Sequence, residues 1–148
     1  MPVKLWKALA AAAPDTPVTL EGEALTAEGR IVRAGQLQGA PRRGLRVVFS
    51  GDTSPCAALE KAAAGADLLL HDATYGEDEQ EAEAALWGHS TFRQAGELAA
   101  RAGARRLWLT HFSQALTDPE AALPNAAQSF PQARCGFDGL RETLCFEE

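Results

Sequence analysis

The stretch LRVVFSGDTSPCAALEKAAAGADLLLH, residues 45–71, contains the pattern on which the fold prediction rests. Its first six residues form a nearly continuous apolar run, as expected of a β-strand that is covered on both faces. Ser54 can cap a helix that begins at Pro55, and Gly65 ends this helix about three turns later. The segment ADLLLH at residues 66–71 then predicts a second strand. Strand, helix and strand in this order are typical of an α/β layered sheet.

The chain downstream continues this alternation. Thr91 and Gln94 form a capping-box pair that predicts the start of a helix, and Gly103 is its predicted end. The segment RRLWLTHF at residues 105–112 predicts a third strand, and residues 133–146 predict a last strand or a hairpin. The whole pattern therefore indicates the α/β class.

One further helix is expected between the last two strands. Asp118 can cap a helix that begins at Pro119. We expect Pro124 to shorten or break this helix, because an interior proline removes a backbone hydrogen bond and its ring clashes with the preceding turn.

The composition is that of one folded domain, with 46% hydrophobic and 23% charged residues. No apolar run approaches the roughly 20 residues that span a bilayer, so we expect no membrane span. We predict a single domain over residues 1–148, with an irregular or hairpin lead-in over residues 1–44 and an α/β core over residues 45–148. Residues 18–32 of the lead-in alternate around turn glycines and predict a β-hairpin or two short strands. The three cysteines form no CxxC pair, which indicates a reducing cytoplasm.

The charge is unevenly distributed along the chain. The net charge of −6 comes entirely from residues 75–148, which include the acidic run Glu77–Glu83. Phosphate contacts come from concentrated lysine and arginine, so we expect no uniform nucleic-acid-binding surface. A local basic patch remains open, because five arginines cluster in the first half of the chain.

Residues that can bind a metal or transfer a proton lie at the ends of the predicted strands. Asp52, Asp72 and His111 lie at or just after the carboxyl ends of three strands, the edge where α/β sheets bind ligands. The Asp52 carboxylate can ligate or bridge metal ions, and the imidazole of His111 is a good zinc ligand. His89 follows Gly88 at the start of a helix, where an anion such as phosphate is favoured and a histidine can protonate a leaving oxygen.

Each of these positions also has a structural interpretation. Asp52 can hydrogen-bond its own turn, and His111 can be a strand-end histidine whose ring is satisfied within the fold. His89 can belong to an exposed capping segment. His71 and Asp72 can form a turn in which the histidine is satisfied. The residues alone leave these alternatives open.

Four segments in this order resemble the carboxyl-terminal half of ribonuclease Z, the tRNA 3′-processing endonuclease of the metallo-β-lactamase superfamily. The segments are SGDT at residues 50–53, HDAT at 71–74, GHSTFRQAGELA at 88–99 and RRLWLTHFS at 105–113. The resemblance extends over about Gly29 to Leu140. It implies half of a metallo-β-lactamase αβ/βα sandwich, with a mixed sheet and helices on one face.

The resemblance also implies roles for the site residues. Asp52 would bridge two zinc ions, and His111 would ligate one of them. His89 would contact the scissile phosphate and help to protonate the leaving 3′ oxygen, with Asp72 near it. The family has HEAT where this chain has HDAT, so Asp72 is one methylene shorter in its reach toward His89. The implied reaction is zinc-dependent hydrolysis of a phosphodiester in precursor tRNA.

The chain departs from the family in its metal ligands. The family's HxHxDH motif and a further zinc-binding histidine lie upstream of SGDT, whereas this chain has three histidines, none in HxH spacing. A catalytic zinc site needs about three protein ligands, so we expect the chain alone to be inactive. We expect a homodimer or a complex with a missing amino-terminal half. The alternatives are a non-catalytic half-fold that serves as a binding or assembly module, and another hydrolase of the same superfamily.

Overall fold

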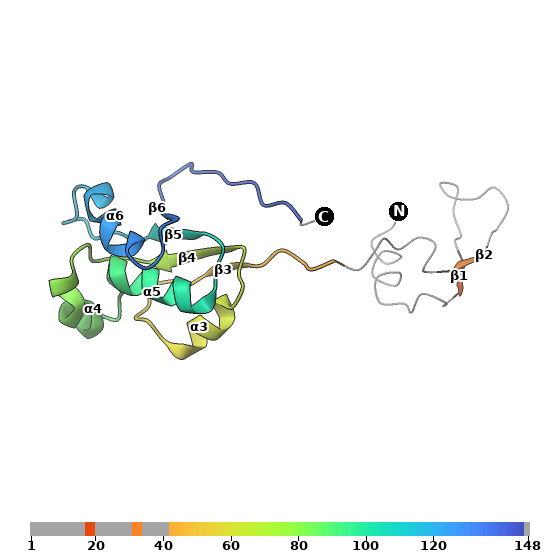
Figure 1. The fold of residues 1–148 in the computed structure, drawn as a ribbon, viewed down its shortest axis with the longest axis horizontal. Coiled ribbons are helices and arrows are strands. Elements are labelled where there is room, and N and C mark those ends of the chain that lie inside the picture. Colours follow the sequence, from red (N-terminus) through yellow and green to blue (C-terminus); the bar gives the residue numbers. More distant parts are fainter. Residues whose placement is uncertain (1–16, 20–30, 34–41, 147–148) are drawn as a thin grey trace. The chain divides into compact units, whose positions relative to one another are not determined.

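The computed structural model describes residues 17–19, 31–33 and 42–146 (Figure 1). The chain divides into two compact units, residues 1–43 and residues 44–148. That the two act as a single domain stays a prediction.

In the first unit, strand β1 (Pro17–Thr19) pairs antiparallel with strand β2 (Ile31–Arg33). This pairing agrees with the two short strands predicted around residues 18–32. The connection between them, which the hairpin prediction concerns, lies outside the described residues.

The second unit is built on a four-stranded sheet with the order β3-β4-β5-β6, and every neighbouring pair of strands is parallel. The strands are β3 (Val47–Phe49), β4 (Leu68–Asp72), β5 (Leu107–Thr110) and β6 (Ala133–Cys135). The α/β class is confirmed. The described sheet is parallel throughout where a mixed sheet was expected, because the segment over residues 133–146 supplies only β6 and no returning strand.

Each parallel pair is joined by a crossover that contains a helix. The helices are α3 (Ala57–Ala63), α4 (Glu81–Trp87), α5 (Phe92–Ala102) and α6 (Pro119–Ala127), and the short 3-10 helix η1 (Asp78–Gln80) precedes α4. Because sequential crossovers are right-handed, α3, α5 and α6 lie on one face of the sheet. Figure 1 shows α5 along the sheet, where it contacts β4, β5, α3 and α6. No helix in the described ranges is both long and apolar enough to cross a membrane.

The core lies between the sheet and these helices. Leu69, Leu107 and Leu109 from the strands pack with Phe92 and Leu98 of α5, and all five are fully buried. Burying a side chain of this size contributes about 1.5–3 kcal/mol each, so this layer stabilises the fold and fixes the strand ends.

The opposite face of β3 is open. Side chains alternate along a strand, so Val48 packs against the core while its neighbours point away from the helices. Val47 is 55% exposed and Phe49 is 70% exposed.

Two of the predicted helix starts are confirmed. The Thr91 side chain accepts a hydrogen bond from Gln94, the capping box is present, and Gly103 ends α5 in the left-handed conformation. Asp118 caps α6 through a hydrogen bond from Ala121.

Other helix predictions were wrong. Helix α3 begins at Ala57 with Cys56 as its N-cap, not at Pro55 after Ser54. The turn before this helix is fixed by hydrogen bonds to other segments of the chain. Thr53 N donates to Asp72, and the Thr53 carbonyl oxygen accepts from Ser90. Pro124 lies inside α6, which continues to Ala127.

Candidate functional site

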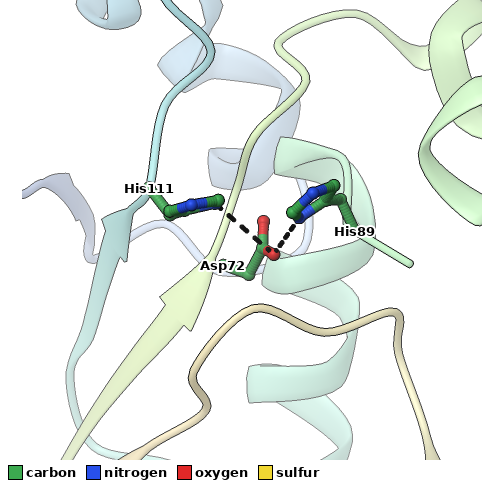
Figure 2. A group of neighbouring side chains, drawn as sticks. All are labelled: Asp72, His89 and His111. Atoms are coloured by element: carbon green, nitrogen blue, oxygen red, sulfur yellow. Dashed lines mark hydrogen bonds and ion pairs between the residues drawn. The ribbon is translucent and has the colours of Figure 1, made fainter. Parts of the chain in front are cut away.

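The parallel sheet brings the carboxyl ends of β3, β4 and β5 to one edge, and the predicted site residues meet there. Asp72 is the last residue of β4 and His111 follows β5 directly. His89 lies before α5 and points toward both (Figure 2). Asp52 follows β3, and its Oδ2 lies 3.4 Å from Nε2 of His111. The structure therefore places all four residues together, and their roles stay predictions.

Asp72 is the most tightly held of the four. It is 1% exposed, and its Oδ1 accepts hydrogen bonds from Thr74 N at 2.9 Å and Thr74 Oγ1 at 2.8 Å. Its Oδ2 accepts from Thr53 N at 3.0 Å and lies 2.8 Å from His89 Nδ1. A buried carboxylate is costly unless it is hydrogen-bonded, and these partners compensate for the lost water.

The His89 ring is oriented by this carboxylate. With Nδ1–H donating to Asp72, Nε2 is the nitrogen left to exchange a proton with another molecule. The His89 side chain is 20% exposed, so Nε2 has a route to solvent or ligand. The shorter side chain of Asp72, compared with the family's glutamate, still reaches the ring.

His111 has an unusual backbone conformation. Its φ is +62°, and no other non-glycine residue in the described part of the chain has a positive φ. Such a conformation is sparsely populated outside glycine and recurs at functional sites, although histidine adopts it more readily than most residues. It turns the His111 ring toward the site, where it stacks on His89 with the ring centroids 5.1 Å apart.

The donor atoms at this edge suit a zinc ion. Ligand atoms of Asp72, His89 and His111 lie within 4.8 Å of one another, and imidazole and carboxylate are zinc ligands. Asp72 is the poorer candidate of the two aspartates, because each of its oxygens already accepts two hydrogen bonds.

Asp52 and His111 form the better pair. The Asp52 side chain is 64% exposed, and its Oδ2 lies 3.4 Å from His111 Nε2. Two ligands bound to a tetrahedral zinc at roughly 2.0–2.1 Å would lie about 3.3 Å apart. The separation therefore fits a shared ion, and binding one there breaks none of the hydrogen bonds of Asp72.

His71, the histidine of HDAT, does not join the site. It is fully buried, and alternation along β4 places it on the helix-facing side with Leu69. Its Nδ1–H donates to the Asp72 carbonyl at 2.7 Å, while Nε2 has no hydrogen-bond partner among the described residues. Burial lowers the pKa of His71, which keeps the ring neutral.

Sequence reasoning missed two residues of the site. Thr53 and Thr74 both donate hydrogen bonds to Asp72, and Thr74 also contacts His111. Both lie inside the motifs SGDT and HDAT, one and two residues after an aspartate near the end of a strand, and this position was the available signal.

The sequence model of a protein family, described as the beta-lactamase superfamily domain, matches residues 8–112 of the chain. The chain belongs to the beta-lactamase superfamily. The predicted resemblance to ribonuclease Z is also confirmed. Ribonuclease Z of Myxococcus xanthus is 49% identical over 130 residues, which are 86% of this chain and 40% of that protein. Ribonuclease Z of Gemmatimonas aurantiaca is 43% identical over 122 residues, 82% of this chain and 38% of that protein.

Solved structures of the superfamily agree with the fold. The metallo-beta-lactamase fold protein YhfI from Bacillus subtilis matches with a TM-score of 0.52 and 27% identity, over 60% of this chain and 35% of that one. Human tRNase Z, short form, matches with a TM-score of 0.51 and 28% identity, over 74% of this chain and 35% of that one. The chain thus spans less than half the length of these relatives.

Proposed function

We propose that the chain is the carboxyl-terminal half of a ribonuclease Z-like phosphodiesterase that cleaves precursor tRNA at its 3′ end. Asp52 and His111 would hold zinc, and His89 with Asp72 would handle the proton. The observation that carries this proposal is the position of the His89–Asp72 pair directly beside the Asp52–His111 pair. A zinc ion, when bound, would supply Lewis-acid stabilisation of the charge that develops on the phosphodiester oxygens.

His89 has the geometry of a general acid. In its doubly protonated form, Nδ1–H donates to Asp72 and Nε2–H is available to the leaving 3′ oxygen. The negative charge of Asp72 compensates the positive ring, and the hydrogen bond keeps the ring from rotating. Proton transfer from Nε2 leaves the neutral Nδ1–H tautomer, which the same hydrogen bond stabilises.

We further propose that an amino-terminal half completes the site in the cytoplasm. Asp52 and His111 are two ligands, whereas a catalytic zinc site uses about three protein ligands and an open position. Ribonuclease Z of Myxococcus xanthus, matched over 40% of its length, has ample chain to supply the rest. The exposed Val47 and Phe49 give such a half an apolar sheet face to pack against.

The test is reconstitution. The chain is assayed with zinc and precursor tRNA, alone and together with the part of the Myxococcus xanthus protein that lies outside the match. We expect cleavage only in the mixture, and loss of that cleavage when Asp52→Asn replaces the wild-type chain. Cleavage of bis-p-nitrophenyl phosphate without cleavage of precursor tRNA would instead indicate another hydrolase of the superfamily. A complex that forms but cleaves neither substrate would favour a binding or assembly module.

A further inference from the structure

Thr74 lies between the Asp72–His89 pair and the Asp52–His111 pair and contacts one residue of each. Its Oγ1 lies 2.8 Å from Asp72 Oδ1, 2.9 Å from His111 Nδ1 and 3.0 Å from the His111 carbonyl oxygen. The residue is 8% exposed, so water does not compete freely for the hydroxyl. A threonine hydroxyl has a single proton, so only one of these three neighbours can receive it.

We assign the Thr74 hydroxyl proton to the hydrogen bond with Asp72 Oδ1. A hydrogen bond to an ionised acceptor is roughly twice as strong as one to a neutral acceptor, and Asp72 carries the charge among the three. Asp72 is also 1% exposed, so leaving Oδ1 short of a donor would not be repaired by solvent. The Thr74 oxygen is then an acceptor toward His111, and Nδ1 of that ring must carry a proton.

We infer that Thr74 is a positioning residue that fixes the Nδ1–H tautomer of His111 and so presents the Nε2 lone pair to a divalent metal ion beside Asp52, an inference that rests on the proposed function. The opposite tautomer would point Nε2–H at Asp52 Oδ2, 3.4 Å away, and would block metal binding. Histidine ligands of metals commonly have their second ring nitrogen fixed in this way by a hydrogen bond.

The same contact couples the two residue pairs. Asp72 receives the Thr74 hydroxyl on Oδ1 and the His89 ring on Oδ2. One buried carboxylate therefore sets the orientation of His89 directly and the tautomer of His111 through Thr74. Neither histidine needs the metal ion to adopt its working form.

The test is direct observation of the tautomer in the metal-free chain. Long-range proton–nitrogen NMR correlations of the ¹⁵N-labelled chain at pH 8, with a chelator present, report which ring nitrogen carries the proton. His111→Gln assigns the signals. We expect the Nδ1–H form of His111 in the wild type and in Thr74→Ser, which keeps the hydroxyl. We expect a shift to the Nε2–H form in Thr74→Val, which keeps the shape but accepts no hydrogen bond.

Metal titration gives a second measurement. Cobalt(II) or zinc alone should bind Thr74→Val about 10- to 100-fold more weakly than the wild type, with recovery in Thr74→Ser. An Nε2–H tautomer of His111 in the wild type, or an unchanged tautomer in Thr74→Val, would overturn the inference. If Thr74→Val does not fold, the wild-type spectrum still decides. Failure of the reconstituted complex to cleave precursor tRNA would remove the proposed function and leave this tautomer result in place.

Discussion

Oδ2 of Asp72 and Nδ1 of His89 lie 2.8 Å apart, although one residue ends strand β4 and the other precedes helix α5. The two are brought together because His89 follows Gly88, which ends α4 with φ +79° in the left-handed conformation that glycine adopts readily. The buried carboxylate can therefore orient the ring before any substrate arrives.

This pair leads to a prediction on turnover. In the reconstituted complex, His89→Ala should lower kcat by about 10²–10⁴ and change KM little, because a general acid acts in the transition state. Multiple-turnover cleavage over a range of precursor tRNA concentrations measures kcat and KM. Glu97→Gln, a change of a partly exposed side chain on α5, is the control and should cleave at the wild-type rate. Equal turnover of His89→Ala and wild type would remove the role assigned to His89.

The contact between α5 and α6 leads to a prediction on stability. A Cβ added to Gly96 would lie 2.5 Å from the backbone oxygen of Ala126. Gly96→Ala should therefore lower the free energy of unfolding by about 1–3 kcal/mol through overpacking. Alanine is the better helix former by about 1 kcal/mol, so a net loss reports the clash itself.

Urea unfolding followed by circular dichroism measures this loss. Gly44→Ala is the control, because an added Cβ there meets nothing within 4 Å, and its free energy of unfolding should change by less than about 0.5 kcal/mol. A Gly96→Ala chain as stable as the wild type would show that the two helices separate easily.

The parts of this fold that local sequence determines were predicted well. The strands β4 and β5 contain the short apolar runs LLL and LWL, and the start of α5 is specified by Thr91 and Gln94 within one turn. Asp52, Asp72 and His111 could be grouped at one edge because parallel strands end together, which follows from topology alone. His89 could be added because it lies at the start of a predicted helix.

Features that depend on contacts through space could not be predicted. Helix α4 lies in an acidic segment in which Ala84 is its buried residue, so no apolar periodicity marks it. Pro124 lies inside α6, a helix that packs closely on α5 near Gly96, and no local sequence signal shows this packing. The link from Thr74 to His111 joins residues 37 positions apart, and only the folded chain shows it.

The cysteines should differ sharply in reactivity. Burial raises the pKa of the Cys135 thiol to about 12, and the negative charge of Glu120 adds to the effect. Cys56 and Cys145 are exposed. Because the thiolate is the reactive form, a disulfide reagent at pH 8 should modify Cys56 and Cys145 quickly and Cys135 only after unfolding in urea. The double variant Cys56→Ser, Cys145→Ser isolates Cys135. Rapid labelling of this variant in the native state would contradict the burial of Cys135.

The open face of strand β3 leads to a prediction on self-association. Val47 and Phe49 point away from the helices and are 55% and 70% exposed. Exposed apolar surface costs about 25 cal/mol per Å² in water, so covering these two side chains would stabilise the chain. Without an amino-terminal half, we expect the chain to form a homodimer that packs sheet on sheet.

Sedimentation velocity at low micromolar concentration measures the association. The double variant Val47→Lys, Phe49→Lys should shift the chain to a monomer, because it places charge on the face that the dimer buries. Leu86→Lys, a similar change at a 76% exposed position on α4, is the matched control and should leave the dimer intact. Adding the amino-terminal half should dissociate the wild-type homodimer, since both compete for one face. A compact wild-type monomer that binds no hydrophobic dye would show that this face is already covered within the chain.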